Sequence, residues 1–198
     1  MHRTSGDTSG DYDSVVGYAG IIIKKSGDKD FSEPVKLAKK TIETYINEDR
    51  TIARPDPLPP IFEQQAGVFV SLHKFGQLRG CIGTFEPSHD NIAEEIISNA
   101  ISSATRDPRF SPVTADELKH LDYNVDVLTA PEAIEDIKEL NPRKYGVIVE
   151  KDHRKGLLLP DLEGVDTAEQ QIDICRRKAG IMPHEKVQLY RFEVKRYK

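Results

Sequence analysis

The chain has 198 residues, a formal net charge of −5 at pH 7 and 37% hydrophobic residues. This length suffices for one domain with a hydrophobic core or for two small lobes. The acidic balance argues against broad nucleic-acid binding, and no apolar run reaches the length of a membrane span. The two cysteines do not indicate a disulfide framework. Because no signal-peptide pattern follows Met1, the expected compartment is the reducing cytoplasm.

Residues 1–31 differ in composition from the rest of the chain. Residues 4–13 are rich in Gly, Ser, Thr and Asp, whereas residues 15–23 form an apolar run that favours a strand. A strand needs a partner, and little near this run in the sequence could supply one. We therefore treat residues 1–31 as an N-terminal segment separate from the domain that follows.

That domain, residues 32–198, is predicted to begin with a helix. Ser32 is a good N-cap, and the acidic residue and the proline after it suit a first helical turn. Apolar residues then recur on one helical face, namely Val35, Ala38, Ile42, Tyr45 and Ile46. The proline-rich stretch 54–60 predicts a stiff surface connection rather than a helix or a central strand.

Residues 68–84 predict a β-hairpin whose second strand reads LRGCIGT and begins at Leu78. Side chains of a regular strand alternate between its two faces. Arg79 and Cys81 are therefore expected on one face, toward a cleft. Leu78 and Ile82 are expected on the other face, against the core.

The same strand carries candidates for chemistry. A guanidinium near a cysteine favours the thiolate, so Cys81 is a candidate nucleophile, acceptor or redox centre assisted by Arg79. A lone cysteine is usually a small buried hydrophobe, and this structural role stays open for Cys81. Gly80 and Gly83 suggest a bulge or the close approach of another group. Glu86 directly follows the motif and is a candidate general base or a turn cap.

A helix is predicted next, from its N-cap Asn91 to about Thr105. Behind it lie Arg106, Asp107 and Arg109. Guanidinium groups pair with carboxylates and phosphates, which makes these residues candidates for an anion site. The alternative is structural, since Asp107 can bond local backbone and the arginines can fasten the loop.

The C-terminal half predicts further strands and one helix. Strands are expected at 123–127 and 190–194, with a hairpin over 145–159. A helix over 167–178 places Cys175 on its apolar face, so this cysteine is predicted to be structural. Helices that mix with hairpins rather than βαβ crossovers predict an α+β fold.

Motifs for metals and cofactors are missing from the sequence. None of the six histidines stands in a metal-binding spacing, and Cys81 with Cys175 is not a zinc pattern. We therefore predict no metal and no cofactor. Basic clusters at 176–178 and 195–198, the second beside Tyr197, leave a nucleic-acid-associated regulatory protein as one alternative function.

Three blocks of sequence resemble the AMMECR-type domain family, also called AmmeMemoRadiSam system protein A. They are LRGCIGT at 78–84, ATRDPRFSPV at 104–113 and KAG at 178–180. The resemblance implies two unequal lobes, a mainly antiparallel sheet with flanking helices and a cleft carrying the LRGCIG segment. It also favours a substrate- or anion-binding role beside the cysteine for Gly80, Gly83, Thr84, Arg106, Asp107 and Arg109.

A second resemblance concerns residues 4–18, which are similar to the C-terminal end of a Memo-like domain. It implies that the chain is the tail of a Memo–AMMECR fusion, the alternative being an ordinary flexible leader. The family context implies Memo-like and radical-SAM partners, and the first hypothesis is a module that works with them through a cleft centred on Cys81. The alternatives are a thiol-dependent enzyme acting on a small anionic substrate and the nucleic-acid-associated regulator.

Overall fold

The computed structural model describes residues 31–198, and Ser32–Lys198 form one compact unit. Its α-helices are α2 (Glu33–Glu48), α3 (Ile92–Thr105) and α4 (Ala168–Ala179), with short 3-10 helices at Pro60–Phe62, Ala115–His120 and Ile137–Glu139. Its strands are β1 (Val68–Lys74), β2 (Gln77–Thr84), β3 (Leu121–Leu128), β4 (Glu132–Ile134), β5 (Gly146–Lys151), β6 (Arg154–Leu158), β7 (Gln188–Phe192) and β8 (Val194–Tyr197). The strand and the Memo-like segment predicted within residues 1–30 lie outside the described residues.

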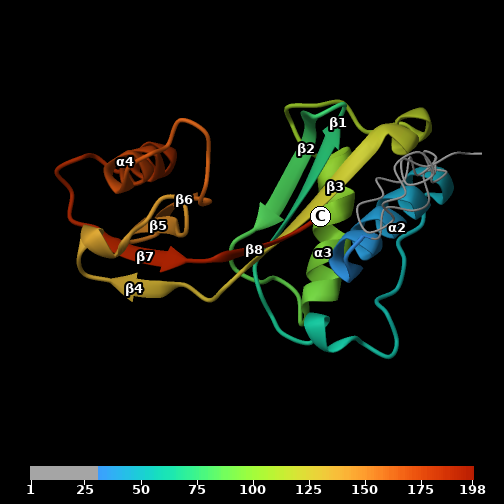
Figure 1. Ribbon diagram of the computed structural model, residues 1–198, viewed down its shortest axis with the longest axis horizontal. Coiled ribbons are helices and arrows are strands. Elements are labelled where there is room, and N and C mark those ends of the chain that lie inside the picture. Colours follow the sequence, from blue (N-terminus) through green and yellow to red (C-terminus); the bar gives the residue numbers. More distant parts are fainter. Residues whose placement is uncertain (1–30) are drawn as a thin grey trace, which may run out of the picture. The chain divides into compact units, whose positions relative to one another are not determined.

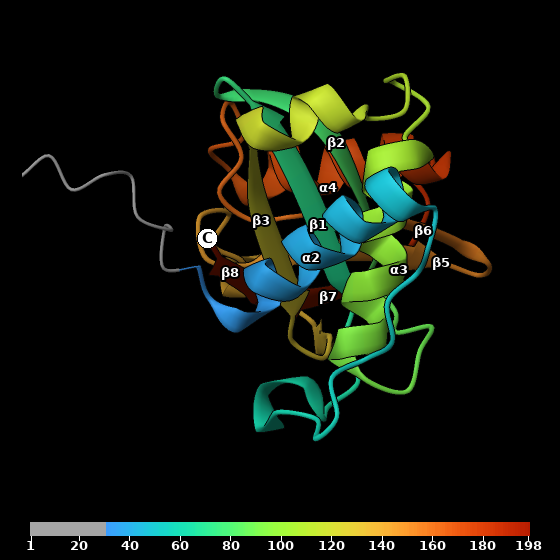
Figure 2. The same ribbon diagram turned by 90° about the vertical axis from the view of Figure 1, so that its right-hand side faces the viewer.

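The strands form two antiparallel sheets of four strands each (Figure 1). Their orders are β2-β1-β3-β8 and β4-β7-β5-β6. Figure 2 shows α2 and α3 on one face of the first sheet, and α4 packs on β5 and β6 of the second. The predicted α+β fold with antiparallel sheets is confirmed. Within the described part of the chain, no helix is long and apolar enough to cross a membrane.

The core of the first sheet follows the predicted patterns. Alternate residues of β1, Val68, Val70 and Leu72, are fully buried, and so are Val35 and Ile42 of α2. Ser32 precedes α2 as expected, but its side chain makes no cap hydrogen bond. Its Oγ donates instead to the backbone oxygen of Lys198 at 3.5 Å.

The second sheet has its own core, between its strands and α4. Cys175 is fully buried there, as its helical spacing predicts, and burial raises the pKa of its thiol to about 12. A Cβ on Gly156 of β6 would lie 2.0 Å from the backbone oxygen of Cys175. Only a glycine lets helix and strand approach this closely.

The prediction of a single strand over 190–194 is wrong, because the chain passes from one sheet to the other within these residues. Residues up to Phe192 belong to β7 in the second sheet, and residues from Val194 belong to β8 in the first. Between them, the backbone N–H of Glu193 donates to Thr129 Oγ1 at 2.9 Å, and its oxygen accepts from the Thr129 N–H at 3.0 Å. The alternation of side chains continues across the switch, so no sequence pattern marks it.

Candidate functional site

A β-bulge in β2 decides where the side chains of the LRGCIGT motif point. The register with β1 shifts by one residue between Leu72 and His73, which leaves Arg79 as the extra residue of β2. The predicted regular alternation is therefore wrong at Arg79. Leu78, expected in the core, is 40% exposed. The bulge that the glycines suggested is present, and it separates the side chains of Arg79 and Cys81.

Two glycines of the motif are required by close packing. A Cβ on Gly80 would lie 2.2 Å from the backbone oxygen of Ser103 in α3, and one on Gly83 would lie 2.3 Å from the Phe69 ring. These distances are far below van der Waals contact. The predicted close approach is confirmed at both positions, and it gives both glycines a packing role.

Arg79 is fully engaged away from the thiol. Its Nε and Nη2 donate to the two carboxylate oxygens of Glu117 at 3.0 and 2.9 Å, and its Nη1 donates to the backbone oxygen of Ser111 at 2.9 Å. Lys74 also donates to Glu117, at 2.8 Å. The hydrogen bonds from Arg79 and Lys74 hold the pKa of Glu117 well below its usual range. Arg79 thus fastens the hairpin to the segment that follows α3.

Asp107 and Arg109 lie beside Cys81, as predicted. The backbone N–H of Cys81 donates to Asp107 Oδ2 at 2.8 Å, and Arg109 Nη2 donates to the backbone oxygen of Cys81 at 3.2 Å. Arg109 also donates to Asp107 through Nε at 2.9 Å and Nη2 at 2.7 Å. The hydrogen bond from Arg109 is the main cause that holds the pKa of Asp107 well below its usual range. This pair covers the open edge of β2, where backbone groups would otherwise lack a strand partner.

A second arginine, which the sequence did not reveal, lies on the same face of the first sheet as Cys81. Arg196 of β8 pairs with Asp126 of β3, which pairs with Phe69 of β1. Phe69 lies two residues before Ser71, the partner of Cys81. Ser71 Oγ donates to Cys81 Sγ at 3.3 Å. Arg196 of β8 donates from Nε and Nη2 to Asp126 of β3, both at 2.8 Å. The pKa of Arg196 is raised chiefly by this hydrogen bonding to Asp126, and the charge of Cys81 adds to the shift. Cys81 likewise contributes to the raised pKa of Arg109, after Asp107.

The two ion pairs around Cys81 turn their positive ends to solvent. The side chains of Asp107 and Asp126 are 2% and 5% exposed, whereas those of Arg109 and Arg196 are 54% and 40% exposed. An anion approaching from solvent therefore meets guanidinium groups rather than carboxylates. The arrangement can hold a small anion within reach of a thiol.

Three other predicted residues make their contacts elsewhere. Arg106 lines a pocket of about 610 Å³ on the helix side of the sheet. Thr84 donates its hydroxyl to Glu95 of α3. Glu86 forms an ion pair with Lys155 of β6 at 2.8 Å, and its side chain is 63% exposed. Glu86 therefore links the end of β2 to the second sheet.

Comparison with known proteins gives consistent matches over this part of the chain. The profile of the AMMECR1 family matches residues 35–197. A Thermotoga maritima protein is 52% identical over 167 residues, which cover 83% of this chain and 96% of that protein. Protein CA_C1420 of Clostridium acetobutylicum is 50% identical over 166 residues, but these cover only 35% of its length. The crystal structure of uncharacterized protein PH0010 from Pyrococcus horikoshii matches with a TM-score of 0.74 and 36% identity, covering 82% of this chain and 88% of that one.

Proposed function

This chain belongs to the AMMECR1 family, and we propose that it binds a small anionic substrate beside Cys81 and acts on it through the thiol. The observation that carries the proposal is the pair of outward-facing guanidinium groups around Cys81. Arg109 donates to the backbone oxygen of Cys81, and Arg196 lies on the same face of the sheet as its side chain. Guanidinium groups fix carboxylates and phosphates by charge-assisted hydrogen bonds. An anion held there would place its neighbouring atoms against the thiol. The Ser71 hydroxyl, which donates to Sγ at 3.3 Å, would be a side-chain donor for the reacting group.

We also propose that the protein works with a Memo-like and a radical-SAM protein in the reducing cytoplasm, as the sequence resemblance implies. In support, the matching segment of the C. acetobutylicum relative is about a third of a longer chain, so the domain also occurs joined to other sequence. Affinity purification of the tagged chain from its native host under mild conditions is expected to recover both partners. Recovery of neither, with the bait folded and abundant, would contradict this part of the proposal.

The anion site predicts that Cys81 favours an anionic alkylating agent. The same thiolate attacks the CH2 carbon of iodoacetate or iodoacetamide and displaces iodide. The ratio of the two rates therefore cancels the thiolate fraction and reports local charge. Two opposite unit charges 4 Å apart attract each other by about 1 kcal/mol in water. We therefore expect the iodoacetate-to-iodoacetamide ratio at Cys81 to exceed that of glutathione at least about threefold.

Peptide mapping by mass spectrometry measures this ratio in the native protein and separates the two cysteines. Cys175 is fully buried and serves as the internal control, which stays unmodified while the protein is folded. A reactive Cys81 with the ratio of glutathione would refute the anion site. A Cys81 that reacts only on unfolding would assign it a packing role.

A further inference from the structure

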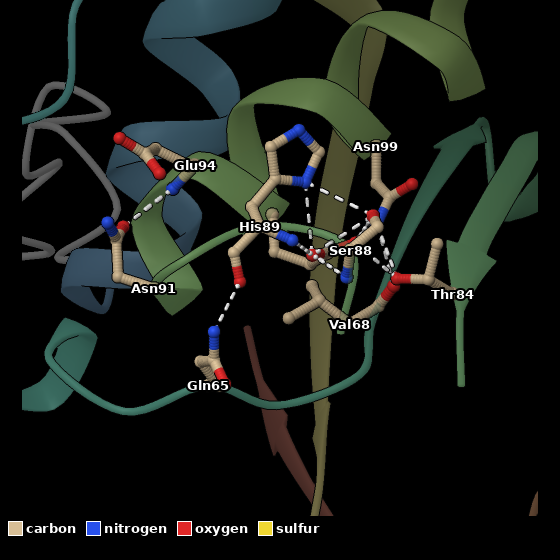
Figure 3. Close-up of polar contacts among 9 residues, drawn as sticks. Gln65, Val68, Thr84, Ser88, His89, Asn91, Glu94 and Asn99 are labelled. Carbon is tan, nitrogen blue, oxygen red and sulfur yellow. Dashed lines mark hydrogen bonds and ion pairs between the residues drawn. The ribbon is translucent and has the colours of Figure 1, made fainter. Parts of the chain in front are cut away.

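A buried carboxylate organises the loop between β2 and α3. Glu95 of α3 is 1% exposed. It accepts hydrogen bonds from the Thr84 hydroxyl, from the backbone N–H and hydroxyl of Ser88 at 2.9 and 3.0 Å, from the backbone N–H of His89 at 3.0 Å and from Asn99 Nδ2 at 3.3 Å. Figure 3 shows Thr84, Ser88, His89 and Asn99 converging from different elements. The sequence pattern did not reveal this network.

The network determines which nitrogen of His89 carries a proton. Burial raises the pKa of Glu95, but the hydrogen bonds from Thr84, Ser88 and His89 outweigh it and lower that pKa below its ordinary value. An ionised carboxylate can only accept, and His89 Nδ1 lies 3.1 Å from Glu95 Oε2. The Ser88 hydroxyl also lies 3.2 Å from Nδ1, but it donates to Glu95 Oε1 at the shorter distance of 3.0 Å. We therefore infer that Nδ1 holds the proton, and in the neutral ring Nε2 is an acceptor. Figure 3 shows the second ring nitrogen turned away from the network.

His89 also lines the pocket of about 610 Å³, whose walls come from α2, α3 and residues 51–54. This volume lies in the range of small-molecule sites. Ile52, Ile97 and Ile101 supply an apolar wall. Arg54 Nε lies 3.6 Å from a Glu94 oxygen, whereas Arg106 makes no ion pair within residues 31–198. The pocket therefore combines an apolar wall, a guanidinium without an ion-pair partner among the described residues and an imidazole acceptor.

This pocket and the Cys81 surface are distinct. Arg106 and Arg109 both follow α3, but Arg106 lines the pocket and Arg109 donates to Asp107 and to the backbone oxygen of Cys81 at the β2 edge. Within residues 31–198, the residues that hydrogen-bond to the Cys81 thiol or backbone are not among those that line the pocket. The proposal for the pocket therefore uses none of the residues on which the function proposed at Cys81 rests.

We propose that the pocket is a second site, for a small organic anion that has an apolar body and a hydroxyl group. Arg106 pairs with the anionic group, the isoleucines contact the apolar body, and His89 Nε2 accepts the hydrogen bond of the hydroxyl. Glu95 acts as a positioning residue, since it fixes the orientation and tautomer of the ring. A buried carboxylate that orients a histidine in this way is a recurrent arrangement for accepting protons from hydroxyl groups.

The tautomer is tested by long-range ¹H–¹⁵N NMR of the full-length, ¹⁵N-labelled protein. His89 is expected to carry its proton on Nδ1, while the exposed His153 and His184 report the tautomer of a solvated ring in the same spectrum. Glu95→Gln is expected to weaken the preference for Nδ1. A His89 ring with its proton on Nε2 in the native protein would overturn the proposal.

Binding is tested with 4-hydroxyphenylacetate, with phenylacetate as the probe without a hydroxyl and 4-methylphenol as the probe without an anion. The first is expected to shift the His89 Nε2 resonance saturably at millimolar concentration and to bind at least about fivefold more tightly than either control. Arg106→Gln is expected to abolish the affinity gained from the anionic group. His89→Leu, which leaves no acceptor at this position, is expected to abolish the affinity gained from the hydroxyl group. The proposal fails if the three probes bind equally or not at all. It also fails if the Arg106 variant still prefers the anionic probes or the His89 variant still prefers the probes with a hydroxyl group.

Discussion

Gly80→Ala is expected to destabilise the protein by about 3 kcal/mol, since overpacking of a tight contact costs about that much. The added methyl group would stand 2.2 Å from the backbone oxygen of Ser103. A backbone atom within a helix cannot rotate aside as a flexible side chain can, so β2 and α3 must separate. Chemical denaturation measures the effect as a lower midpoint at an unchanged slope.

Gly76→Ala is the matched control for this substitution. Gly76 has a φ of +79° in the turn between β1 and β2, and a Cβ there would meet nothing within 4 Å. Its replacement costs only the left-handed backbone conformation, about 1 kcal/mol. If Gly80→Ala proved no more destabilising than Gly76→Ala, the close packing of α3 against the LRGCIGT strand would be refuted.

Glu95→Ala is expected to cost about 4 kcal/mol, because it leaves several buried donors without an acceptor at once. The affected groups are the Thr84 hydroxyl and two backbone N–H groups of the loop, whereas Asn99 keeps the Val68 backbone oxygen as its acceptor at 3.1 Å. Glu163→Ala, at an exposed carboxylate, is the control and is expected to change stability by less than about 0.5 kcal/mol. Equal effects of the two substitutions would contradict the network.

The same carboxylate makes stability depend on pH. The pKa of Glu95 is lowered in the folded protein from the ordinary value of 4.5, so the unfolded chain binds the proton more readily. The stabilisation is therefore fully present above pH 4.5 and is lost as pH falls through the folded pKa. Glu95→Gln removes this titration. The free energy of unfolding of the native protein is therefore expected to approach that of the Glu95→Gln variant as the pH falls below 4.5. A difference that stays constant with pH would contradict the lowered pKa.

The elements that the sequence predicted well are those with local signals. Asn91 caps α3 by accepting from the Glu94 N–H at 3.0 Å, and Gly180 ends α4 in the left-handed region at a φ of 64°. Such caps depend on residues a few positions apart. The split between β7 and β8 at Glu193 depends on a contact with Thr129, 64 residues away, and no local pattern could indicate it.

The candidate site shows the same division. Asp107 and Arg109 lie beside Cys81, where the sequence resemblance favoured them, whereas the bulge at Arg79 turns a predicted partner of the thiol toward Glu117. Arg196 was missed because the pairing of β3 with β8 alone brings it to this face. The roles of these residues in function stay predictions.

The central claim is that Arg109 and Arg196, rather than Arg79, supply positive charge at Cys81. Its most direct test is the iodoacetate-to-iodoacetamide ratio at Cys81 in two variants. Asp126→Asn with Arg196→Gln removes one guanidinium without leaving the buried carboxylate unpaired. Arg79→Met is the control, because Lys74 still pairs with Glu117. We predict that the iodoacetate-to-iodoacetamide ratio falls toward that of glutathione in the first variant and stays unchanged in Arg79→Met. An unchanged ratio in the first variant, or a lower ratio in folded Arg79→Met, would contradict the claim.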